Sequence, residues 1–195
     1  TTMSEIVQKA EDFVTHLLET ELDPKFLYHN LKHTQRVVKS AKELLEQHDL
    51  EPKKNEELVL AAWFHDTGYT KGTDHHEKRS SEIANAFLDQ EGYDKEGIKN
   101  IQNLILATER HHVPSNLTEE IIRDADASHF AQKSYWETTD FLREELQLLG
   151  IVSHSPKEWR DINIKMFRNE HRFYTQYAKD NWEPGKEKNL KQLIK

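Results

Sequence analysis

Apolar residues recur at a spacing of three and four along almost the whole chain of 195 residues, the pattern of amphipathic helices. The residues that usually break helices are scarce, with only 6 Gly and 5 Pro, and almost no stretch alternates as a strand would. The pattern predicts helices over about 4–19, 26–48, 55–68, 75–90, 95–110, 118–132, 134–149 and 156–180. We therefore expect an all-α protein.

The chain shows no internal repeat and no linker, and its length suits one domain. We expect residues 1–195 to form a single-domain helical bundle, with a motif region over 28–130 and a C-terminal helical cover over about 134–195. Ser155, Pro156 and Glu158 form the capping-box sequence with which the last long helix should begin. A short tail follows Pro184.

The charge balance narrows the set of partners. Lys and Arg number 27 against 35 Asp and Glu, so the net charge is −8. This balance argues against a nucleic-acid polymer or a membrane surface as partner, although a local basic pocket can still bind a small phosphate. Nothing resembles a signal peptide or a membrane span, so we expect a cytoplasmic protein. The chain has no Cys, so any metal must be held by nitrogen and oxygen.

Histidine is unusually frequent, and nine of the 12 lie between His29 and His129. His65 and Asp66 directly follow the apolar run LVLAAWF, where ionisable side chains are unfavourable unless they are paired or bind a metal. A second His-Asp pair, His48 and Asp49, lies in a polar stretch and is interpreted as solvated.

Helical spacing places two more candidate ligands on the inner faces of their helices. His33 shares the apolar face of its helix with Val37, and Asp126 follows Ile122 on the inner stripe of another helix. Imidazole and carboxylate from three helices suit one or two divalent cations, with Mn, Fe, Ni, Co, Zn and Mg as candidates. The predicted first site consists of His33, His65, Asp66 and Asp126.

A second cation would share the Asp66 carboxylate. His76 and His111 are the predicted additional ligands. Their neighbours His75 and His112 point elsewhere by about 100° on a helix, and within each pair the assignments can swap.

These motifs resemble the HD superfamily of metal-dependent phosphohydrolases. The resemblance is carried, in order, by YHNLKH, WFHDTGY, HHEKRSS, ILATERHH and IIRDADASHF. It implies a helical bundle, metal ligation by His33, His65, Asp66 and Asp126 rather than Asp124, and a metal-activated water that attacks phosphorus.

A phosphohydrolase also needs groups that hold the phosphate and protonate the leaving group. Lys71, which follows the HDTGY turn, is the first candidate for a phosphate contact, together with Arg36, Arg79 and Arg110. Asp66, Lys71 and Glu77 are the predicted catalytic residues, with His76 and His112 as alternative proton donors. We expect His29 to contact the substrate, a small phosphorylated compound such as a nucleotide.

Two alternatives remain at this stage. Some HD-domain proteins are di-iron oxygenases, which have a similar ligand set. A non-catalytic module that keeps its metal as a structural staple is the other. An aromatic stripe in the C-terminal part is interpreted as core or as the surface of a possible homodimer; it consists of Trp159, Phe167, Phe173, Tyr174 and Tyr177.

Overall fold

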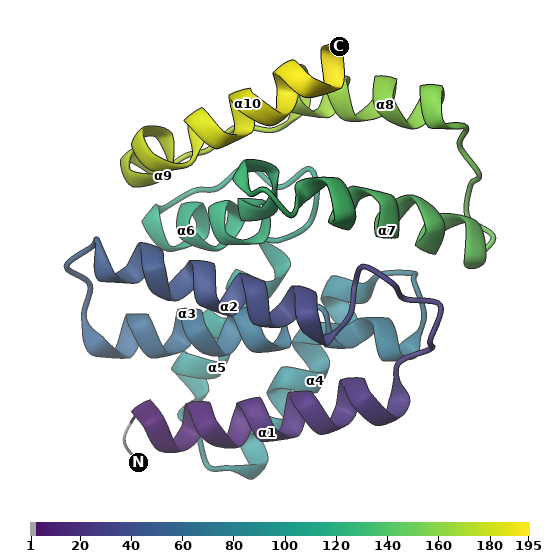
Figure 1. Cartoon of the computed structure of the whole chain (residues 1–195). Coiled ribbons are helices and arrows are strands. Elements are labelled where there is room, and N and C mark those ends of the chain that lie inside the picture. The colour runs from purple at the N-terminus through teal and green to yellow at the C-terminus, as the bar shows by residue number, and fades with distance from the viewer. Residues whose placement is uncertain (1–2) are drawn as a thin grey trace.

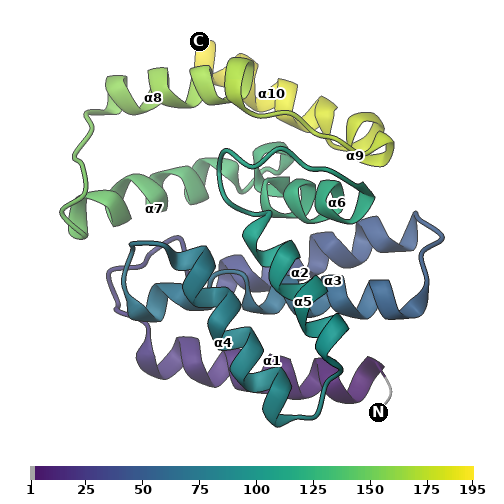
Figure 2. The same cartoon turned by 180° about the vertical axis from the view of Figure 1, so that it is seen from behind.

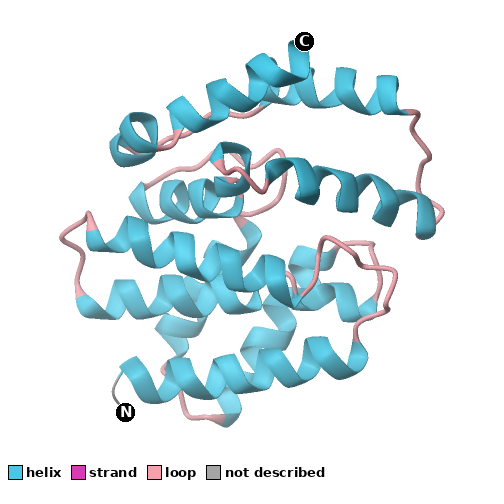
Figure 3. Ribbon diagram, in the orientation of Figure 1, coloured by secondary structure: helices cyan, strands magenta, loops and turns pink. Residues whose placement is uncertain are grey.

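The computed structural model describes residues 3–195, and within that range it contains helices and loops but no strand (Figure 3). The all-α prediction is confirmed. The α-helices are α1 (Met3–Glu21), α2 (Leu31–Glu46), α3 (Pro52–Phe64), α4 (His76–Gln90), α5 (Lys95–Leu106), α6 (Leu117–Asp126), α7 (Tyr135–Leu148), α8 (Pro156–Lys165), α9 (Gln176–Asn181) and α10 (Glu183–Ile194). Short 3-10 turns, η1 (Thr67–Lys71) and η2 (Ser128–Ala131), follow α3 and α6.

Helix α3 lies at the centre of the N-terminal part. Every residue from Glu56 to Phe64 is buried, because α1, α2 and α5 pack around it. Figure 1 shows α1, α3 and α2 as successive layers, and Figure 2, from behind, shows α4 and α5 crossing them. A helix that is covered on several sides needs no polar face, so the apolar run before His65 carries the His-Asp pair into the interior.

The turn after α3 differs from the prediction. The helix begins at Pro52, not after Asn55, and ends at Phe64, before Gly68. Gly68 instead lies inside η1, where a Cβ atom would overlap the backbone of His76 and Ser80. The absence of a side chain therefore allows η1 to lie directly against the first turns of α4, and the Gly68 N–H donates to Ser80 Oγ at 2.8 Å.

The predicted continuous helix over 156–180 is wrong. The capping box at Ser155 does start α8, but α8 ends at Lys165 and a single π-helical turn, Met166–Glu170, follows. The next residues are extended because the buried Asp124 carboxylate accepts hydrogen bonds from the N–H groups of Tyr174 and Thr175 at 2.9 and 2.8 Å. This tertiary contact removes two N–H groups that a continuous helix would use itself.

The C-terminal helices form a separate layer, with α8, α9 and α10 above α6 and α7 (Figure 1). The segment after Pro184, expected to be a short tail, belongs to α10. This helix packs on η2: Asn189 Nδ2 donates to the carbonyl oxygens of Phe130 and Gln132 at 2.9 and 3.0 Å. Trp159, Phe167 and Phe173 of the aromatic stripe are buried. The C-terminal layer is thus attached to the turn that directly follows Asp126.

Within residues 3–195, no helix combines the length and the apolar character that crossing a bilayer requires.

Candidate metal centre

Four side chains from three helices converge in the interior. His33 comes from the first turn of α2, His65 and Asp66 follow the end of α3, and Asp126 is the last residue of α6. The Nε2 atom of His33 lies 3.2 Å from Asp66 Oδ2 and 3.2 Å from Asp126 Oδ1. The Nε2 atom of His65 lies 3.2 and 3.3 Å from the same two oxygens. The structure therefore brings together all four residues of the predicted first site.

Two buried atoms of this cluster lack a hydrogen bond and are suited to bind a divalent cation. His65 Nδ1 donates to the Ala62 carbonyl oxygen at 2.7 Å, which leaves Nε2 with its lone pair in the neutral ring. His65 Nε2 and Asp66 Oδ2 are both buried, and neither makes a hydrogen bond of acceptable geometry despite their short separation. Ligand atoms of His33, His65 and Asp66 lie within 4.8 Å of one another. Buried polar atoms without hydrogen bonds are rare, and a bound cation would satisfy these.

Electrostatics in the cluster keep its two aspartates ionised. Burial alone would lower the pKa of His33 and His65, but the carboxylates of Asp66 and Asp126 raise both pKa values. Burial alone would likewise raise the pKa of the two aspartates, but the adjacent histidines hold both well below the usual range. The aspartates are therefore ionised and available as anionic ligands.

His76 is the only other predicted ligand that reaches Asp66. Its Nε2 lies 3.3 Å from Asp66 Oδ1, the oxygen that points away from His33 and His65, and 3.4 Å from Glu77 Oε2. Its ring stacks on Tyr69 with the centroids 4.0 Å apart. His75 is exposed and has a left-handed backbone (φ 54°). Of the two neighbours, His76 is therefore the one whose side chain faces Asp66.

His111 does not join the cluster. Helix α5 ends at Leu106 rather than near residue 110, so the helical phase that placed His111 inward is lost. The His111 side chain is exposed and makes no contact with Asp66 or His76. His112, the alternative, pairs with Glu119 at 2.7 Å.

Of the four predicted phosphate-binding side chains, two already make contacts with other groups. Arg110 forms an ion pair with Glu170 at 2.9 Å, and Arg79 donates to the carbonyl oxygen of Lys71. Lys71 is exposed at the end of η1. Arg36 is half-buried, and its buried Nε has no hydrogen-bond partner. Of these four side chains, Lys71 and Arg36 therefore remain available to bind a phosphate.

Sequence reasoning missed two residues beside the cluster. Glu145 of α7 is buried and pairs with His29, its Oε2 lying 2.6 Å from His29 Nδ1. The ring of Tyr69 in η1 contacts the rings of both His29 and His76. Glu145 lies in an ordinary amphipathic helix, so no sequence signal identifies it. Tyr69 belongs to the HDTGY segment, and its position next to the His-Asp pair is a usable signal.

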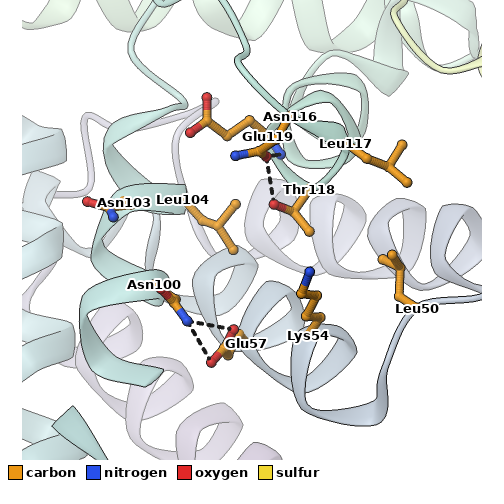
Figure 4. Close-up of a pocket in the computed structure, with 10 residues that line it drawn as sticks. All are labelled: Leu50, Lys54, Glu57, Asn100, Asn103, Leu104, Asn116, Leu117, Thr118 and Glu119. Carbon is orange, nitrogen blue, oxygen red and sulfur yellow. Dashed lines mark hydrogen bonds between the residues drawn. The ribbon is translucent and has the colours of Figure 1, made fainter. Parts of the chain in front are cut away.

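Neither of two surface hollows is lined by a residue of the cluster. One, of about 310 Å³, lies between α3, α5 and the start of α6 and is lined by Glu57, Asn100 and Glu119 among others (Figure 4). The other, of about 560 Å³, is lined by the segment between α1 and α2 and by Tyr69 and Thr70. Only the second hollow borders a residue in contact with His76.

Comparison with known proteins gives one match. No curated protein and no solved structure matches the chain. A family model, the HD domain, matches residues 30–131, which is just over half of the 195 residues. The matched segment contains His33, His65, Asp66 and Asp126, the residues that converge in the structure. The chain therefore belongs to the HD domain family.

Proposed function

We propose that this protein is a metal-dependent phosphohydrolase that cleaves a phosphoester bond in a nucleotide or another small phosphate. The observation that supports this most directly is the pair of buried atoms, His65 Nε2 and Asp66 Oδ2, that lack hydrogen bonds within a cluster of family-typical ligands. A metal-stapled binding module would share this cluster, so turnover is the property that distinguishes the two.

The residues of the first site would hold one divalent cation. When bound, such a cation supplies a water of lowered pKa and neutralises charge on the phosphoryl oxygens. His33 and His65 both face Oδ2 of Asp66 and Oδ1 of Asp126, and the other oxygen of Asp66 faces His76. Asp66 thus connects the first site to the side on which a second cation would lie.

The remaining chain would position the phosphate. Lys71 is exposed at the end of η1, the turn that follows the His-Asp pair, and the hydrogen bond from Arg79 to its carbonyl oxygen fixes this end of the turn. Arg36 offers a guanidinium group one helical turn after His33. Charged donors of this kind bind non-bridging phosphoryl oxygens well. We leave Arg110 out of this role, because it already pairs with Glu170.

A small substrate fits the surroundings better than a polymer. The hollow beside Tyr69 is lined by no Lys or Arg, and the whole chain carries a net charge of −8. A polyanion gains affinity from many cations, which this surface does not gather. The exposed His111 also removes one ligand of the set on which the di-iron alternative relied.

The test combines metal content with turnover. Purified protein loaded with Mn, Co, Ni or Mg is assayed against nucleotides, cyclic nucleotides and aryl phosphates, and bound metal is measured by mass spectrometry. His65→Ala and Asp126→Ala should remove both the metal and the activity, because each deletes a ligand of the buried cation. His48→Ala, in the solvated pair, should retain both; its Nδ1 donates only to the Leu44 carbonyl oxygen. Wild-type protein that binds metal but hydrolyses nothing on this panel would refute the proposed function.

A further inference from the structure

The buried carboxylate of Glu145 links α7 to the residues just before α2. Its Oε1 accepts hydrogen bonds from the N–H groups of Tyr28 and His29, both at 2.9 Å. Its Oε2 lies 2.6 Å from Nδ1 of the His29 ring. Burial alone would raise the pKa of Glu145, but these hydrogen bonds, led by that from the His29 ring, lower it. The carboxylate is therefore ionised, and both of its oxygens accept hydrogen bonds.

These contacts fix the orientation of the His29 ring. A carboxylate only accepts, so Nδ1 carries the proton and Nε2 is the ring nitrogen that faces away from Glu145. Tyr28 and Tyr69 contact the ring, both with centroids 4.6 Å away, and the His33 ring lies 5.7 Å away. Within residues 3–195, Nε2 has no hydrogen-bond partner, and the His29 side chain keeps 22% exposure. The ring thus presents one free nitrogen beside a metal ligand.

The two partners of this pair come from outside the matched HD domain. His29 immediately precedes residue 30, where the match begins, and Glu145 lies beyond residue 131, where it ends. Glu145 belongs to α7, which lies over the N-terminal end of α2 in Figure 1. A surface salt bridge contributes little, but a buried carboxylate with three donors holds its partner rigidly.

We propose that Glu145 is a positioning residue of the active site, which holds His29 so that Nε2 contacts the substrate. Helix α7 would then complete the site of the HD domain rather than only pack against it. A neutral ring held in this way accepts from an O–H group, and a protonated ring donates to a phosphoryl oxygen. The inference rests on the proposed function, because it requires a phosphorylated substrate beside the metal cluster.

The decisive variant is Glu145→Gln. The amide keeps the size of the side chain and an oxygen for the two backbone N–H groups, but it lacks the charged acceptor for Nδ1. We expect kcat to fall by roughly 10- to 100-fold, as for other partners that orient a functional histidine. Bound metal should stay at the wild-type level, because no metal ligand changes. His29→Gln, which leaves Glu145 in place, should lose activity to at least the same extent, and the double variant should lose no more than His29→Gln alone.

Glu119→Gln is the matched control. Glu119 pairs with His112 at 2.7 Å and accepts from the Ser115 N–H at 3.0 Å, so it repeats the arrangement away from the cluster. This variant should keep wild-type kcat. An equal loss in Glu119→Gln, or wild-type kcat in Glu145→Gln, would overturn the assignment.

A binding measurement separates this inference from the proposed function. Ring nitrogen NMR signals of His29, assigned with His29→Gln, are followed in Mg-loaded protein during titration with inorganic phosphate. We expect the Nε2 signal to shift in the wild type and to respond much less in Glu145→Gln, even if no substrate on the panel is hydrolysed. An unchanged wild-type signal, or an identical shift in both proteins, would overturn the positioning role.

Discussion

Asp66 connects the parts of the candidate site, because its two oxygens face different histidines. Oδ2 faces His33 and His65, and Oδ1 faces His76. The sequence predicted these partners because buried ionisable residues at helical spacing have few alternatives to a shared cation. It failed at His111 for a local reason: the helix that should have carried this residue inward ends at Leu106.

The two histidines offered for a second cation can be compared directly. We expect His76→Ala to lower activity at limiting metal concentration and to reduce the bound Mn per chain if two ions bind. His111→Ala should change neither, because this exposed side chain makes no contact with Asp66. Metal titration by calorimetry and mass spectrometry checks both variants. The assignment of His76 is wrong if the two variants behave alike.

At the scale of elements, the site depends on the contact between η1 and α4. Gly68 makes this contact possible, because no Cβ intervenes between η1 and the backbone of His76 and Ser80. The sequence suggested only that this glycine ends a helix. The end of such a helix depends on which element packs against it. The spacing of apolar residues along the chain does not contain this information.

Gly68→Ala should therefore push the start of α4 away from η1. We expect a loss of about 1–3 kcal/mol in the free energy of unfolding, the usual range for overpacking. Urea unfolding measures it. Ser80→Ala, which removes the hydrogen bond without a clash, should lose only about 1 kcal/mol. Wild-type stability in Gly68→Ala would mean that α4 adjusts without strain.

At the scale of the molecule, the N-terminal helices were predicted well and the C-terminal layer poorly. Helices α1, α2, α4 and α7 lie close to their expected ranges, since each has a clear apolar stripe. The break near His171 was missed because long-range hydrogen bonds to Asp124 decide it. His171 itself is now enclosed by Phe130 and Phe173, and neither ring nitrogen has a partner.

This enclosure predicts sensitivity to acid. Burial, together with the charges of Lys186, His129 and Arg123, lowers the pKa of His171 to about 2, whereas an unfolded histidine has a pKa of about 6.5. Stability from the neutral ring is therefore complete above pH 6.5 and is lost as the pH falls below it, by at most about 1.4 kcal/mol per pH unit.

The variant His171→Phe removes this proton linkage. Its unfolding free energy, measured by urea titration between about pH 7 and 5, should fall less steeply with acid than that of the wild type. A control at exposed His16, His16→Phe, should keep the wild-type slope. Equal slopes in all three proteins would show that His171 is not enclosed in solution.

Asp124 and Asp126 lie two positions apart on α6 and contact different parts of the chain. Asp126 faces the histidines, and Asp124 accepts from Tyr174 and Thr175 in the C-terminal segment. A chimera that joined this HD segment to a foreign C-terminal part would keep the cluster residues. Asp124 would nevertheless lose three donated hydrogen bonds, and His29 would lose the carboxylate of Glu145. The exchangeable unit for engineering is therefore the HD segment together with α7 and the extended residues before α9, and not the HD segment alone.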